Sequence, residues 1–101
     1  MIDFVLSDKP QIVLSETTQS LGTFVDNNIP VVLKCKADGI PDPKYRWNDP
    51  VGKQISTAQE YELRNPSLAQ FGDYICEASN KLGSVRKAIN VFQISKYIYH
   101  W

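Results

Sequence analysis

Histidine and cysteine are scarce in this sequence, and it has no long apolar run. The 101 residues contain one histidine, His100, and two cysteines, Cys35 and Cys76. Two cysteines and one distant histidine do not complete a tetrahedral zinc site, and a nucleophilic cysteine needs a neighbouring base. No apolar stretch is longer than four residues, whereas a membrane-spanning helix needs about 20. We therefore expect no metal, no cofactor, no membrane span and no enzymatic activity.

The charge balance and the length of the chain narrow the possibilities further. The chain carries 11 basic and 11 acidic residues, so it lacks the basic excess typical of a nucleic-acid-binding protein. Its hydrophobic fraction of 43% and its 11% aromatic residues argue against a disordered segment. We expect a single domain over residues 10–94, with an N-terminal extension at 1–9 and a C-terminal extension or linker at 95–101.

Short alternating segments separated by turns predict an all-β fold. Apolar and polar side chains alternate in residues 31–37, 44–48 and 73–79, and no segment carries a convincing helical repeat. Turn-forming residues interrupt the chain at 38–43, 49–52 and 80–83. Seven or eight short strands joined in this way predict an antiparallel two-layer β-sandwich.

The two cysteines favour a structural role, either as a disulfide or as two buried thiols. If they are bonded, they close a loop of about 42 residues and stabilise the fold by roughly 4 kcal/mol in the chain-entropy model. A disulfide would also imply an oxidising compartment.

Four residues carry a resemblance to a known family. Trp47 follows Cys35 by twelve residues, and Tyr74 stands two residues before Cys76. In this order and strand phase they resemble an immunoglobulin domain of the I-set or C2-like branch. The resemblance implies a disulfide between Cys35 on strand B and Cys76 on strand F. It also implies that Trp47 of strand C packs on that disulfide and that Tyr74 bonds the backbone just upstream.

Two further segments extend the resemblance over most of the chain. Residues 39–43 resemble the family's Gly-x-Pro-x-Pro segment before strand C, and residues 76–83 resemble its F–G hairpin. The resemblance implies a core of the disulfide together with Leu33, Trp47, Leu63 and Tyr74. Gln70 departs from the pattern, because the family usually has an aspartate there whose ion pair supports the E–F corner. The short interval between the cysteines further predicts brief C′ and D strands and no C″ strand.

Strand phase also defines one candidate binding face, on the outside of the sheet made by strands G, F and C. The residues expected on this face are Arg46, Asp73, Ile75, Glu77 and Arg86. Mixed charges around an exposed isoleucine are compatible with a rimmed contact patch. They are equally compatible with an ordinary hydrated sheet, which is the simpler interpretation.

The resemblance implies a non-enzymatic interaction or spacer module from a multi-domain adhesion molecule or receptor. Such a module would lie outside the cell or be secreted. Its expected partners are the same or another cell-surface protein and the adjacent domains of its own chain, with a weak homodimer as a further possibility and no nucleic acid or small-molecule substrate. Two alternatives remain open. One is an intracellular I-set module of a giant muscle or cytoskeletal protein, and the other is a ligand-binding ectodomain of a signalling receptor.

Overall fold

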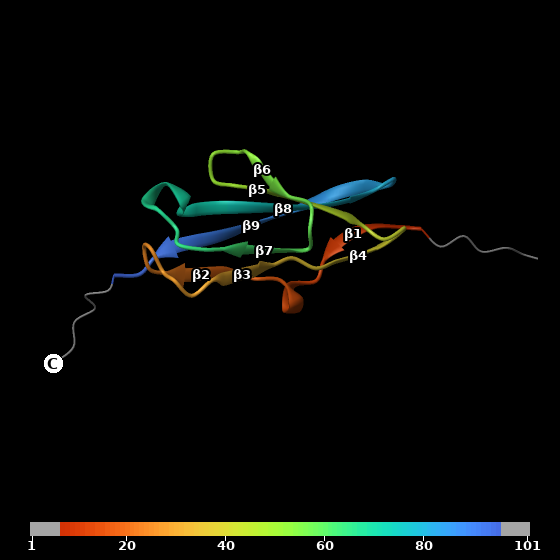
Figure 1. Ribbon diagram of the computed structural model, residues 1–101. Helices are drawn as coiled ribbons and strands as arrows, with labels where there is room; N and C mark the ends of the chain where they lie inside the picture. Colours follow the sequence, from red (N-terminus) through yellow and green to blue (C-terminus); the bar gives the residue numbers. More distant parts are fainter. Residues whose placement is uncertain (1–6, 96–101) are drawn as a thin grey trace, which may run out of the picture.

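The computed structural model describes residues 7–95, which form two layers of β-strands (Figure 1). One layer is a five-stranded sheet in the order β2-β9-β8-β5-β6, and the other contains the pairs β1–β4 and β3–β7. The elements are β1 (Asp8–Ile12), η1 (Leu14–Glu16), β2 (Ser20–Thr23), β3 (Val31–Lys34), β4 (Ala37–Ile40), β5 (Lys44–Asn48), β6 (Gln54–Ser56), β7 (Glu60–Leu63), η2 (Leu68–Gln70), β8 (Gly72–Asn80) and β9 (Gly83–Gln93). The expected all-β sandwich is confirmed, and the described residues contain nine strands in place of the expected seven or eight.

The inner side chains of the two layers meet in one core. Along β8, buried Tyr74, Cys76 and Ala78 alternate with more exposed residues, as the sequence pattern predicts. Because neighbouring side chains of a strand point to opposite faces, this alternation turns one face inward. The buried core cluster consists of Leu33, Cys35, Trp47, Leu63, Tyr74, Cys76, Ile89 and Val91.

A disulfide joins the two layers inside this core. Cys35, which directly follows β3, is bonded to Cys76 of β8, and their Cα atoms lie 6.4 Å apart. Trp47 of β5 is the register neighbour of Cys76. Its Nε1 donates a hydrogen bond of 2.9 Å to the carbonyl oxygen of Ala58. This bond satisfies the only polar group of the buried indole and fixes the ring between the layers.

The prediction of a turn over residues 38–43 is wrong for residues 38–40. Residues Ala37–Ile40 form β4, which pairs antiparallel with β1. The turn is therefore shorter than expected and follows the cis peptide bond between Ile40 and Pro41. Asp38 and Gly39 have low intrinsic strand propensity, but the pairing of Asp38 with Gln11 and of Ile40 with Asp8 on β1 outweighs that preference.

The pairing of β2 also differs from a purely antiparallel sandwich. β2 runs parallel to β9, with Ser20 opposite Asn90 and Thr23 opposite Gln93. All the other strand pairs are antiparallel. Parallel pairing becomes possible because β1, η1 and the following residues carry the chain from the second layer to the edge of the first.

The region between β6 and β7 confirms one expectation and corrects another. β6, only three residues long, is the expected brief strand C′ beside β5. Residues 57–59 then cross directly to β7 in the other layer, so the described chain has no strand D (Figure 1). Three residues are too few to add a strand and return. β7 is therefore the last strand on its side of the second layer.

The corner before β8 is held by Tyr74 and Gln70. The Tyr74 hydroxyl donates a hydrogen bond of 2.7 Å to the Gln70 carbonyl oxygen, which is the tyrosine corner that the resemblance implied. The Gln70 side chain accepts the backbone N–H of Ser67 at 2.8 Å and caps η2. A neutral side chain thus organises this corner by hydrogen bonds, where the family's aspartate would form an ion pair.

The chain enters and leaves the sandwich at opposite ends (Figure 1). β1 begins at Asp8, two residues before the expected domain start. The carbonyl oxygen of Asp8 accepts a hydrogen bond of 2.7 Å from the side chain of Asn80 in the β8–β9 hairpin. At the far end, the backbone N–H of Ile94 donates to the carbonyl oxygen of Thr23 at 2.9 Å. Nearly all of the expected 95–101 extension lies outside the described residues.

Candidate interaction surfaces

Three charged side chains form a row across the outer face of the five-stranded sheet. The register places Arg46 of β5, Glu77 of β8 and Arg86 of β9 beside one another. One carboxylate oxygen of Glu77 accepts a hydrogen bond from Arg46, and the other accepts from Nε of Arg86 at 2.9 Å. The Glu77 side chain is 16% exposed, against 45% for Arg46 and 67% for Arg86. The shielded carboxylate therefore orients two arginines whose outer surfaces stay in water.

The pKa of Glu77 reflects this arrangement. The hydrogen bond from Arg86 is the largest influence and lowers the pKa, whereas partial burial raises it. The positive charges of Arg46 and Arg86 and the hydrogen bond from Arg46 lower it further. The pKa lies below its usual value, so Glu77 is ionised at neutral pH and keeps both arginines in place.

The adjoining rows of the same face are less charged. Ile75 lies between Asn48 of β5 and Ala88 of β9, and the Asp73 carboxylate accepts a hydrogen bond of 2.9 Å from Asn90. Among the described residues, the Oδ1 atom of Asn48 is buried without a hydrogen-bond partner. By register, all the expected face residues share this surface: Arg46, Asp73, Ile75, Glu77 and Arg86.

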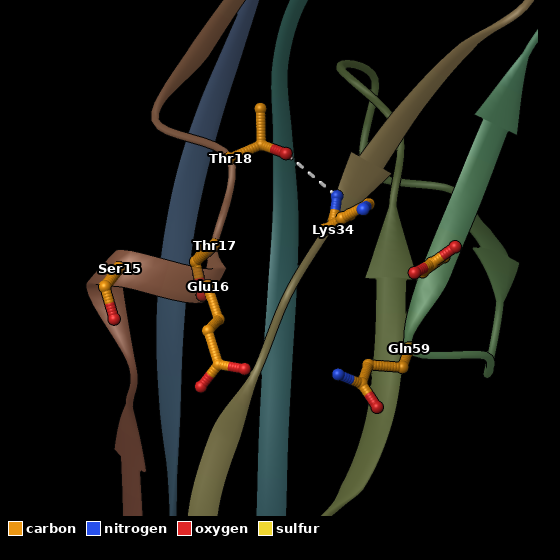
Figure 2. A pocket seen from close by; sticks show the side chains of 7 residues that line it. Ser15, Glu16, Thr17, Thr18, Lys34 and Gln59 are labelled. Carbon is orange, nitrogen blue, oxygen red and sulfur yellow. Dashed lines mark hydrogen bonds between the residues drawn. The ribbon is translucent and has the colours of Figure 1, made fainter.

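A polar hollow of about 510 Å³ lies on the opposite layer (Figure 2). Glu16 and Gln59 approach it from opposite sides, and the Thr18 hydroxyl accepts the backbone N–H of Lys34 at 2.9 Å. Its lining holds side chains of both charge signs but neither cysteine nor histidine. The hollow thus lacks the paired nucleophile and imidazole base of a hydrolase site.

Clusters of metal-ligating side chains and membrane-spanning helices are both absent from the residues that the structure describes. Within residues 7–95, no three histidine, cysteine, aspartate or glutamate side chains are grouped so as to hold a metal ion. In the same part of the chain, no helix has the length and apolar character needed to cross a membrane.

Sequence reasoning did not anticipate the hollow or the exposed side of β7. Both features depend on the direct connection from β6 to β7. Gln59, the last residue of that connection, and Glu60, the first residue of β7, line the hollow. The relevant signal was the short interval between Trp47 and Tyr61, which predicted brief strands but did not reveal which strand would be missing.

Comparison with known proteins identifies the family. A profile of the immunoglobulin domain matches residues 9–80. The neural cell adhesion molecule L1 of Homo sapiens is 32% identical over 94 residues, which cover 86% of this chain and 7% of that protein. Neurofascin of Gallus gallus is 36% identical over 93 residues, which cover 77% of this chain and 7% of that protein. The chain thus spans less than a tenth of the length of these two relatives.

Solved structures show the same architecture. The two-domain DIP-gamma IG1+IG2 structure superposes with a TM-score of 0.78 at 22% identity, covering 88% of this chain and 50% of that one. Titin domain M7 superposes with a TM-score of 0.70 at 23% identity, covering 91% of this chain and 100% of that domain. At these identities the similarity shows the fold alone. Together with the profile match, the interlayer disulfide and the tyrosine corner, it establishes that the chain belongs to the immunoglobulin domain family.

Proposed function

We propose that this domain is a non-enzymatic interaction and spacer module of a multi-domain cell-surface adhesion molecule or receptor. The observation that carries the proposal is the sequence similarity to a named adhesion molecule, L1, over 86% of the chain. The cell adhesion molecule DSCAM of Mus musculus is also similar, at 37% identity over 55% of the chain. The fold by itself would not distinguish adhesion from other uses of the same sandwich.

The disulfide supports an extracellular location. Cys35 and Cys76 are both fully buried and bonded, and the described chain has no free cysteine. Disulfides form and persist in secreted and cell-surface proteins, whereas the cytosol keeps thiols reduced. A domain that relies on this bond suits the outside of a cell.

The positions of the chain ends support a spacer role. The chain enters near β1 and leaves after β9 at the opposite end, so consecutive domains joined in this way extend in a line (Figure 1). β9 spans the length of the sandwich and is hydrogen-bonded to β2 on one edge and β8 on the other. A pull on the exit point is therefore distributed over two strand pairings.

The outer face of the five-stranded sheet is the proposed contact surface. Glu77 orients Arg46 and Arg86, and Ile75 supplies a half-buried apolar position in the adjoining row. Arginines that are already oriented lose less conformational freedom when they bind a partner. A protein surface with acidic groups around a small apolar centre would complement this face.

Binding by beads coated with the domain tests this face. The domain is produced in a secretory pathway and coupled to the beads. The beads are then tested against cells that each display one cell-surface protein, and one of these displayed proteins is the domain itself. Arg46→Glu and Ile75→Asp should each abolish binding that the unaltered domain shows. Lys9→Glu, an exposed charge reversal on β1 of the other layer, serves as the matched control and should leave that binding intact. Unchanged binding in both face variants would remove this surface from the proposal.

The extracellular location has its own test. Intact-mass measurement after alkylation without reduction should detect no free thiol in protein made in the secretory pathway. Two alkylated cysteines would contradict the location and favour an intracellular muscle or cytoskeletal module. The similarity to titin domains is a matter of fold alone and does not by itself support that alternative.

A further inference from the structure

Among the described strands, β7 has a neighbour on one side only. It pairs with β3, and no described strand lies along its other edge. Residues 57–59, which lead into β7, cross between the layers and do not run beside it (Figure 1). An edge strand offers its unpaired backbone groups to any extended chain that reaches it.

The register shows which backbone groups face this free edge. The N–H of Cys35 donates to the carbonyl oxygen of Gln59, so these opposed residues form a hydrogen-bonded pair. Hydrogen-bonded and non-hydrogen-bonded pairs alternate in an antiparallel ladder. Tyr61 and Leu63 therefore bond β3, whereas the N–H and carbonyl groups of Glu60 and Glu62 point away from it. The backbone of Lys34, opposite Glu60, bonds Thr18 on its far side, which agrees with this pattern.

The side chains of β7 divide between the two faces of the layer. Glu60 and Glu62 are exposed on the outside, and Tyr61 points inward and stacks on Tyr74 with ring centroids 6.1 Å apart. A small cavity of about 90 Å³ is lined by Tyr61, Ile55 of β6, Tyr74, the turn residues 49–51 and the corner residues 69–70. β6 and β7 are the outermost described strands of their layers on this side, so Tyr61 connects the free edge of β7 with this cavity.

The charges on β7 argue against a second copy of this chain as the occupant. A symmetric antiparallel pair centred on Tyr61 would place each Glu60 opposite a Glu62 of the other copy. A pair centred on Glu62 would place the two Glu62 side chains opposite each other. Like charges directly across a strand pair are destabilising, so the edge is protected against self-association.

The same charges favour a basic partner. Arg64 forms an ion pair with Glu62 at 2.6 Å, whereas Glu60, opposite Lys34 of β3, belongs to none of the ion pairs found among residues 7–95. We infer that the free edge of β7 binds an extended protein segment in which two basic residues flank an apolar one. Its backbone pairs with Glu60 and Glu62, its basic side chains meet their carboxylates, and its apolar side chain lies beside Tyr61 and the cavity. This site is separate from the outer face of β8.

A synthetic peptide in which lysine alternates with valine is the probe. Nuclear magnetic resonance of the isotope-labelled domain should show about tenfold slower hydrogen exchange at the amides of Glu60 and Glu62 once the site is saturated. The resonances of Tyr61 should shift as well, and the affinity should fall with added salt. A peptide that alternates glutamate with valine is the matched control and should leave these amides unaffected.

Two variants identify the contacts. Exchange of both charges, Glu60→Lys with Glu62→Lys, should weaken binding about tenfold or more. Glu62→Pro removes an N–H that β3 does not use, so it should retain the fold and still impair binding. Asp73→Lys on the other layer should bind the peptide normally. Equal binding of the glutamate peptide, shifts confined to the face of β8, or slow exchange of both amides in the free domain would overturn the inference.

Discussion

Removal of the disulfide is the most informative perturbation of this fold. In Cys35→Ala with Cys76→Ala, the denatured chain regains the freedom of a loop that spans a sequence separation of 41. The chain-entropy relation assigns roughly 4 kcal/mol to a loop of this length. Because both sulfur atoms are fully buried, their loss also leaves unfilled space and adds to the destabilisation. A domain of this size has a free energy of unfolding of about 5–15 kcal/mol, so the variant should be only marginally folded.

Urea denaturation followed by circular dichroism measures this change. The free energy of unfolding should fall by about 4 kcal/mol or more, and the melting temperature should fall by about 15–30 °C. An independent comparison needs no substitutions. It measures the free energy of unfolding of the unaltered domain with and without reductant under mildly denaturing conditions. A loss below about 1 kcal/mol in both experiments would refute the reasoning, because the cross-link would then not constrain the denatured chain.

The further predictions concern three single positions. Tyr74→Phe should lower the free energy of unfolding by about 1–3 kcal/mol in urea titrations, because the Gln70 carbonyl loses its bond. Burial, with smaller contributions from Tyr61 and Asp49, raises the pKa of Tyr74 to about 12, so ultraviolet titration should detect a tyrosine that ionises near pH 12. Glu77→Gln should cost about 0.5–1 kcal/mol at neutral pH. Since the folded pKa of Glu77 is lowered, that stabilisation is present above its unfolded pKa and lost as pH falls through the folded pKa, so parallel melts of the two proteins should converge in acid. Gly22→Ala should destabilise by about 1 kcal/mol in thermal melts, because the new Cβ would stand 2.6 Å from Cδ1 of Ile94.

The central strands follow directly from local sequence pattern. Tyr74, Cys76 and Ala78 of β8 are buried and alternate with more accessible residues, and Trp47 of β5 has the same phase. A shift of the strand register by one residue would move every core side chain of that strand to the solvent-exposed face. Hydrophobic burial therefore determines the register of these strands. The row formed by Arg46, Glu77 and Arg86 was predictable in position for the same reason, although its hydrogen bonds were not.

The edges of the fold were less predictable. Asp38 and Gly39 have the composition of a turn, yet they continue as β4 because β1 lies alongside. The residues between β6 and β7 were expected to include a strand D, but they cross directly between the layers. In both places the outcome depends on which distant segment supplies hydrogen-bond partners. Local propensity does not contain this information.

By itself, the sequence determined the sandwich, its buried cysteines, tryptophan and tyrosine, and the family to which the chain belongs. These features follow from side chains that alternate with a period of two, because burying one face of each strand is what stabilises the fold. Only the tertiary structure decided the parallel pairing of β2 with β9, the double hydrogen bonding of Glu77 and the exposed edge of β7. Each of these joins residues far apart in the chain, and their geometry is settled by the packing of the whole domain.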